Sequence, residues 1–157
     1  MLDRRRFLTI LGTTGMVVTI RPSFAEAGLP KVVVTKDPNC GCCGGWVDHM
    51  RAAGFPVEVV TTPQVNRVKA RLGVPDDLAS CHTAEVGGYV IEGHVPADAV
   101  KRLLAEKPQA KGLAVPGMPV GSPGMEVEGM APDTYDVVLF GPLGHTTFAR
   151  YRGSQII

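Results

Sequence analysis

Hydrophobic positions between residues 31 and 106 alternate between the period of a strand and the period of a helix. Short β-branched or apolar runs bounded by turn residues predict four strands, at residues 31–35, 57–61, 82–86 and 89–94. Apolar residues at helical spacing, followed by Gly or Pro, predict three helices, at residues 46–53, 63–72 and 96–106. The predicted order of elements is therefore β-α-β-α-β-β-α.

This order is that of a thioredoxin-like α/β fold, in which the third strand runs antiparallel to the first. The dipeptide Gly87-Gly88 is typical of a two-residue hairpin turn and would pair Val86 with Tyr89. Ligands of such sheets gather at the carboxyl ends of the parallel strands. We therefore expect the functional site where the first strand leads into Cys40.

The pattern changes after residue 107. The chain has 19 Gly and 13 Pro, and they concentrate after residue 111, which predicts loops. Residues 135–140 and 146–151 then predict a terminal β-hairpin. We expect one thioredoxin-like domain at residues 26–107 and a Pro/Gly/Met-rich C-terminal extension at residues 108–157 that packs on the site.

The first 25 residues have the parts of an export signal. Residues 4–6 are arginines, residues 8–20 are apolar apart from Thr and Gly, and residues 23–25 place small residues at the first and third positions of a cleavage site. The Arg-Arg-x-Phe-Leu order beginning at Arg4 resembles a twin-arginine signal, which directs folded proteins across the inner membrane. We expect cleavage after Ala25 and a periplasmic protein. A general secretory signal and an uncleaved anchor are the alternatives.

Charge and length restrict the class of function. Removal of residues 1–25 takes away four arginines and one aspartate, which changes the formal charge from +1 to −2. No strongly basic field remains, so we expect no nucleic-acid partner. After signal removal we also expect no membrane association, and a single domain that is a monomer.

Three of the four cysteines, Cys40, Cys42 and Cys43, lie between the first predicted strand and the first predicted helix. The free N–H groups and dipole of a helix start stabilise thiolates. Cys40 and Cys43 have the Cys-x-x-Cys spacing of thiol–disulfide exchange. Cys42 would compete in such exchange, whereas closely spaced thiolates suit bridging of soft metal ions such as Cu(I).

The fourth cysteine, Cys81, immediately precedes the third strand, whose start would lie beside the end of the first. Counting outward from the Gly87-Gly88 turn pairs Cys81 with His94 on one face of the sheet. The same count places His82 on the opposite face. A different turn length would exchange the two histidines.

Methionines in the C-terminal extension add soft sulfur atoms. Met118 and Met125 stand in near repeats, Pro-Gly-Met-Pro and Pro-Gly-Met-Glu, within loops rather than at helical spacing. A thioether is a soft ligand that selects Cu(I). The alternative is that these methionines are apolar filling between the loop and the domain.

Several segments together resemble the bacterial copper-resistance CopG family. They are Cys40-Gly41-Cys42-Cys43-Gly44-Gly45-Trp46, Ser80-Cys81-His82-Thr83, Glu92-Gly93-His94-Val95-Pro96, and the stretch from Gly112 to Glu126. The resemblance covers about residues 31 to 130. It implies a periplasmic thioredoxin-like domain that holds a cysteine-bridged cluster of several copper ions, and a copper oxidoreductase that interconverts Cu(I) and Cu(II) for detoxification or export.

The resemblance also implies the ligands and partners. Cys40, Cys42, Cys43 and Cys81 would supply sulfur, and His94, His82, Met118 and Met125 would be supporting ligands. No catalytic residues separate from this metal site are expected. Partners would be copper ions and a copper efflux or chaperone protein.

Other functions remain open at this point. A metal-free thiol–disulfide oxidoreductase would need only Cys40 and Cys43, although the chain lacks the Pro that thioredoxins place before the third strand. Passive copper storage, a zinc site or an iron–sulfur site could also use four cysteines. Two structural disulfides are the last alternative, and they would need a bridge from Cys81 to the cluster.

Overall fold

The computed structural model describes residues 28–157, and the predicted export signal lies outside this part of the chain. The strands are β1 (Val32–Lys36), β2 (Val57–Thr61), β3 (His82–Val86), β4 (Tyr89–Glu92), β5 (Gly112–Ala114), β6 (Thr134–Gly141), β7 (Gly144–Arg152) and β8 (Gln155–Ile156). The helices are α1 (Cys42–Ala52), α2 (Val65–Leu72) and α3 (Ala97–Glu106), with one 3₁₀ turn, η1 (Asp76–Leu78). Within the described residues no helix has the length and apolar character needed to span a bilayer. The predicted α/β class is confirmed.

The order of elements from β1 to α3 matches the predicted order, and the largest boundary shifts are at α1, α2 and β4. Helix α1 begins at Cys42, four residues before the apolar positions that predicted it, so two cysteines belong to its first turn. Helix α2 begins two residues after Pro63, at Val65. Strand β4 ends at Glu92, not His94, because Gly93 turns the chain with a positive φ of 71°.

All eight strands form one mixed sheet in the order β2-β1-β3-β4-β5-β6-β7-β8. Strand β1 is parallel to β2 and antiparallel to β3, and β4 is antiparallel to β3 and parallel to β5. The Gly87-Gly88 turn sets the expected register, with Val86 opposite Tyr89 and Thr83 opposite Glu92. The first and third strands therefore meet as the sequence predicted.

The C-terminal extension continues the same sheet. The predicted terminal hairpin is present as β6 and β7, with Pro142 and Leu143 at its turn. The short strands β5 and β8 were not predicted, and β5 joins the hairpin to β4. A three-residue and a two-residue strand leave almost no periodicity in the sequence, which explains why they were missed.

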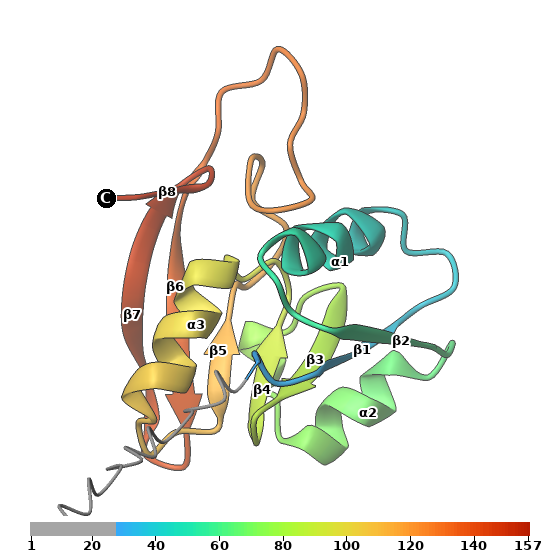
Figure 1. Ribbon diagram of the computed structural model, residues 1–157, viewed down its shortest axis with the longest axis vertical. Coiled ribbons are helices and arrows are strands. Elements are labelled where there is room, and N and C mark those ends of the chain that lie inside the picture. The colour runs from blue at the N-terminus through green and yellow to red at the C-terminus, as the bar shows by residue number, and fades with distance from the viewer. Residues whose placement is uncertain (1–27) are drawn as a thin grey trace, which may run out of the picture.

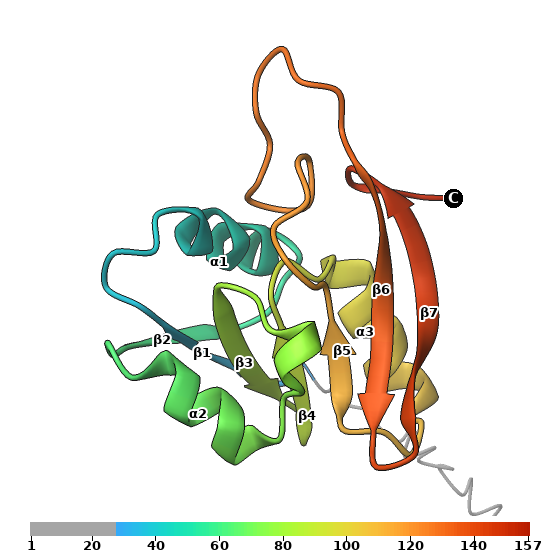
Figure 2. The same cartoon turned by 180° about the vertical axis from the view of Figure 1, so that it is seen from behind.

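Helices cover both faces of the sheet (Figures 1 and 2). The larger core lies under α1 and α3 and includes Trp46, Met50, Val100 and Leu103. The smaller core lies on the side of η1 and includes Val74, Leu78 and Phe140. In Figure 2 helix α2 lies in front of the sheet, on the side away from α3.

The connection between β5 and β6, residues 115–133, rises beyond the end of the sheet beside α1 (Figure 1). Two glycines allow its close approach to α1. A Cβ built on Gly124 would lie 2.5 Å from the backbone nitrogen of Trp46, and one built on Gly45 would lie 2.8 Å from the Cα of Gly124. The backbone of this loop is therefore packed directly against the first turns of α1.

Candidate metal centre

The loop after β1 and the first turn of α1 position three cysteines. The side-chain ammonium of Lys36 donates to the carbonyl oxygens of Asp37 and Cys40, at 3.0 and 3.2 Å, which fixes the loop. Gly41 stands at the N-cap of α1 and supplies no side-chain acceptor for the free N–H groups there. The positive end of this helix therefore lies at the residues that carry the cysteines, as expected from the sequence.

The four cysteine sulfurs converge on one point, all within 4.8 Å of one another. Cys40 and Cys43 form a disulfide, whereas Cys42 and Cys81 are free thiols. The sulfur of Cys42 lies 3.8 Å from that of Cys40 and 3.9 Å from that of Cys81. This arrangement differs from the two-disulfide alternative, since Cys81 is not bonded to the cluster.

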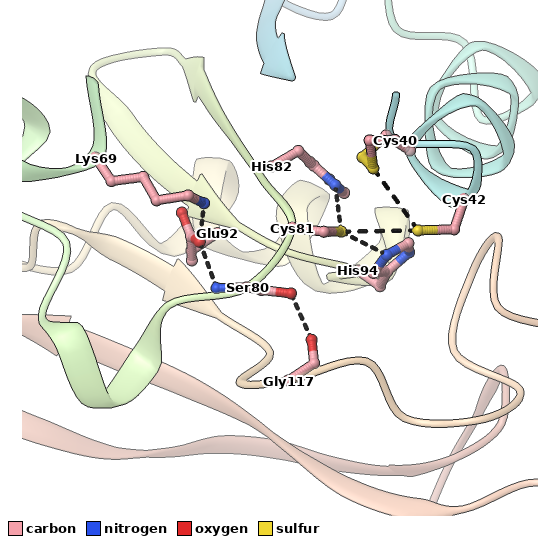
Figure 3. A network of polar contacts seen from close by, with 10 residues as sticks. Cys40, Cys42, Lys69, Ser80, Cys81, His82, Glu92, His94 and Gly117 are labelled. Carbon is pink, nitrogen blue, oxygen red and sulfur yellow. Dashed lines mark hydrogen bonds and ion pairs between the residues drawn. A yellow bond between two sulfur atoms is a disulfide. The ribbon is translucent and has the colours of Figure 1, made fainter. Parts of the chain in front are cut away.

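Cys81 also contacts two imidazoles (Figure 3). Its sulfur lies 3.0 Å from Nε2 of His94 and 3.3 Å from Nδ1 of His82. The contact with His94 agrees with the predicted register. The placement of His82 on the opposite face from Cys81 was wrong, because Cys81 lies in a bend before β3 and does not follow the alternation of the strand.

The surroundings of both histidines keep their rings neutral. Nδ1 of His94 donates to the carbonyl oxygen of Pro123 at 2.8 Å, which leaves the Nε2 lone pair facing Cys81. Burial lowers the pKa of His94 and holds the pKa of His82 well below its usual range. Neutral imidazole is the form that binds metals.

The other nitrogen of His82 is an orphaned buried polar atom. The ring lies 4.6 Å from the ring of Trp46 and is fully buried. Its Nε2 has no hydrogen-bond partner within the described part of the chain. Because buried polar atoms are normally paired, an unpaired nitrogen on an imidazole whose other nitrogen contacts Cys81 fits a site built for a metal ion.

The thiol of Cys81 is protonated in this arrangement. Burial, and secondarily the neighbouring Cys42, raise its pKa to about 11. Metal binding to such a thiol releases its proton, because the thiolate is the ligand.

The donor set fits a soft metal ion. Cys81 belongs to two groups of candidate ligands, the four cysteines and the trio of Cys81, His82 and His94. Thiolate and imidazole donors together suit copper, and thiolates favour Cu(I). Reduction of the Cys40–Cys43 disulfide would be needed before all four sulfurs could bind as thiolates.

The methionine-bearing loop reaches the centre through its backbone. Pro123 accepts the hydrogen bond from His94, and Gly124 packs on α1. Met125 is half-buried, and Met118 is 54% exposed. The structure thus brings the loop of both methionines to the site.

Two charged residues near the centre were not predicted. Glu92 and Lys69 form a buried ion pair, and Glu92 also accepts the backbone N–H of Ser80 at 2.7 Å (Figure 3). A glutamate within an otherwise apolar strand was the available signal, since Glu is almost never fully buried without a partner. The partner on α2 was not visible in the sequence.

The chain is similar to known proteins in both sequence and structure. Residues 78–125 match the family described as "Protein of unknown function, DUF411". A solved structure of copper resistance protein copG, form 2, is 44% identical with a TM-score of 0.74, over 78% of this chain and 98% of that one. The chain belongs to the CopG copper-resistance family. Form 1 of copG matches with the same identity and TM-score, over 80% of this chain and 99% of its own.

The CopG family resemblance drawn from the sequence motifs is therefore confirmed. The DUF411 match contains Cys81, His82, His94, Met118 and Met125. The three cysteines near the start of α1 lie outside that match. No curated protein matches the sequence.

Proposed function

We propose that this protein is a periplasmic copper-binding redox protein for copper resistance. Its cysteine thiolates would hold several copper ions, and an external redox partner would accept or donate one electron for each ion that changes between Cu(I) and Cu(II) during detoxification or export. The observation that carries this proposal is the convergence of four cysteine sulfurs within 4.8 Å, with Cys81 shared between them and two buried histidines. Membership of a family with copper-resistance structures supports copper as the metal.

The proposed ligands divide into two groups. Cys40, Cys42, Cys43 and Cys81 would hold the copper ions through their sulfurs, and His82 and His94 would support them. Met118 and Met125, on the loop that packs beside the site, are the other proposed supporting ligands. The chain's own contribution is to hold these donors together. The start of α1 stabilises thiolates, Pro123 orients the His94 ring, and burial keeps both imidazoles neutral.

The architecture agrees with a thioredoxin-like domain at residues 26–107. The order β2-β1-β3-β4, with β1 parallel to β2 and antiparallel to β3, supports this assignment. Residues 108–157 are then an extension that adds strands to one edge of the sheet and a loop to the metal site.

The cellular context belongs to the same proposal. Residues 1–25 would act as a twin-arginine export signal and be cleaved in the periplasm, leaving a monomer without membrane or nucleic-acid partners. A copper efflux or chaperone protein would exchange copper with it.

A second candidate is a metal-free thiol–disulfide oxidoreductase. The observation that favours it is the Cys40–Cys43 disulfide beside the start of α1. Exchange would begin with attack of an external thiolate on this disulfide and release of one of the two cysteines. Cys42 has no necessary role in that reaction.

Replacement of Cys42 by Ser distinguishes the two functions. Reduced protein is loaded with Cu(I) under anaerobic conditions, desalted, and analysed for copper per chain and for its absorption spectrum before and after oxidation. We expect several ions per wild-type chain and a loss of copper in Cys42→Ser. Wild-type protein that retains no copper, together with disulfide reductase activity unchanged in Cys42→Ser, would establish the second candidate instead.

A further inference from the structure

A buried ion pair lies beneath the loops that carry the proposed ligands. Glu92, at the end of β4, is fully buried, and Lys69 of α2 is 5% exposed. The side-chain hydrogen bonds of these two residues within the described chain run to each other and to Ser80 (Figure 3). Neither side chain therefore forms a hydrogen bond with a sulfur or an imidazole of the described residues.

Stability alone gives a weak reason for this pair. Desolvation of two charges often costs as much as their attraction returns, and a well-packed apolar pair can be equally stable. One oxygen of Glu92, Oε2, also has no hydrogen-bond partner among the described residues. A buried ion pair that adds little stability can instead serve to fix geometry, and the Oε1 hydrogen bond of Glu92 shows which geometry that is.

The geometry that it fixes is the backbone next to Cys81. The Oε1 atom of Glu92 accepts the N–H of Ser80 at 2.7 Å, and Ser80 directly precedes Cys81. Cys81 lies in a bend outside the ladder of β3, so the sheet does not determine its position. The hydrogen bond from Ser80 to the Glu92 carboxylate therefore restrains the backbone at Cys81, which the strand hydrogen bonds do not.

The same residue connects the network to the methionine-bearing loop. The hydroxyl of Ser80 donates to the carbonyl oxygen of Gly117, which precedes Met118. Ser80 also packs against Gly93, where an added Cβ would lie 2.6 Å from the Ser80 side chain. Ser80 thus touches the segments that lead to Cys81, His94 and Met118.

We propose that Glu92 is a positioning residue of the metal site: paired with Lys69, it holds Ser80, and through Ser80 it sets the positions of Cys81 and of the Gly117–Met118 turn. The effect of Glu92 on copper binding rests on the proposed copper function. The positioning of Cys81 can be measured in copper-free protein.

Two double variants isolate the hydrogen bond from the charges. Lys69→Met with Glu92→Gln removes both charges but keeps an oxygen that accepts the Ser80 N–H. Lys69→Met with Glu92→Leu removes the charges and the acceptor. A control variant, Lys31→Met with Glu58→Leu, removes an exposed ion pair. Glu58 lies on β2, and Lys31 directly precedes β1.

The first measurements use full-length, copper-free protein. Amide hydrogen exchange is followed at Ser80, and alkylation of Cys81 is timed in a Cys42→Ser background with the Cys40–Cys43 disulfide intact, where Cys81 is the single free thiol. We expect the Leu double variant to exchange the Ser80 amide about tenfold faster, as for loss of a hydrogen bond to a charged acceptor, and to alkylate faster. The Gln double variant and the control should stay close to wild type. A thermal unfolding transition is measured for each variant to check that it is folded.

The second measurement uses protein with all four cysteines, reduced and loaded with Cu(I). In the Leu double variant we expect the copper affinity to fall about tenfold, with a changed absorption spectrum, and the Gln double variant to restore both. Unchanged Ser80 exchange and Cys81 alkylation in the Leu variant would overturn the proposal. So would changed exchange with copper affinity and spectrum equal to wild type. If wild-type protein binds no copper, the copper function fails, and the exchange and alkylation rates alone decide whether Glu92 positions Cys81.

Discussion

The Nε2 atom of His94 lies 3.0 Å from the sulfur of Cys81, and the Nδ1 atom of the same ring is held by the carbonyl oxygen of Pro123. One imidazole thus connects the strand hairpin to the loop of the C-terminal extension. A ring fixed at one nitrogen presents the other in a set direction, as metal-binding histidines commonly do.

Replacement of His94 by Ala should weaken copper binding more than any change at an exposed histidine. It removes a nitrogen donor beside Cys81 and releases the loop at Pro123. We expect the Cu(I) affinity to fall by more than about tenfold. Loss of a residue that only supports a metal ligand usually costs at least that much. Competition with a Cu(I) chelator measures it.

His145→Ala is the matched control, since His145 is half-exposed and lies 3.7 Å from Asp77, away from the sulfur cluster. Equal affinities of the two variants would exclude His94 from the site.

Thiol labelling tests the arrangement of the cysteines. In copper-free protein that has not been reduced, alkylation after denaturation should label Cys42 and Cys81 only. Cys40 and Cys43 should be labelled after reduction, because they form the disulfide. Peptide mass spectrometry identifies the labelled residues. Labelling of all four without reductant, or a disulfide that includes Cys81, would contradict this arrangement.

Glycine at position 124 should be required for the contact between the loop and α1. Its φ is +83°, and an added Cβ would lie 2.5 Å from the nitrogen of Trp46. Gly124→Ala should therefore cost about 1–2 kcal/mol for the left-handed backbone and about 1–3 kcal/mol for overpacking. Urea unfolding and copper retention measure the two consequences.

Gly129→Ala separates these two costs. Gly129 belongs to the same loop and has a similar φ of +79°, but no atom lies within 4 Å of an added Cβ. Gly129→Ala should lower the free energy of unfolding only by the cost of the left-handed backbone, about 1–2 kcal/mol, and the variant should keep its copper. Similar losses of stability and copper in both variants would show that the contact at Gly124 is not needed.

The stability of copper-free protein should fall in mild acid. Burial lowers the pKa of His49, His82 and His94 below 6.5. The unfolded chain then takes up protons before the folded chain does, so this stability is present above about pH 6.5 and is lost as the pH falls below it. Urea unfolding at several pH values, followed by the fluorescence of Trp46, the single tryptophan, measures the slope.

His49→Gln should reduce that slope, because neutral His49 accepts the backbone N–H of Ala97 at 3.0 Å. His145→Gln serves as the comparison on the surface. A stability that does not change down to about pH 5 would refute the neutral, buried state of these rings.

Met118 and Met125, on the loop that packs beside the site, should contribute to Cu(I) affinity. Met118→Leu and Met125→Leu keep a similar side-chain volume but remove the thioether sulfur. The double variant Met118→Leu with Met125→Leu should bind Cu(I) with about tenfold lower affinity. Met130→Leu, at a residue whose side chain is 57% exposed, is the control. An unchanged affinity in the double variant would assign Met118 and Met125 to packing.

The sequence predicted the core of the fold because its signals are local. A two-residue Gly87-Gly88 turn fixes the hairpin register, and extending that register past the end of the ladder predicted the contact between Cys81 and His94. The extra thiol of Cys42 and the grouping of cysteines before a helix indicated metal chemistry from residue type and spacing alone.

Contacts between segments far apart in the chain were decided only by the tertiary structure. His82 joined the site because Cys81 leaves the strand alternation in a bend, which no period in the sequence reveals. Pro123 reached His94, and Lys69 reached Glu92, through the packing of a loop and a helix that have no fixed register with the strands. The sequence by itself determined the kind of chemistry, because that depends on which donors are present; the tertiary structure decided which donors share one site, because that depends on where separate segments pack.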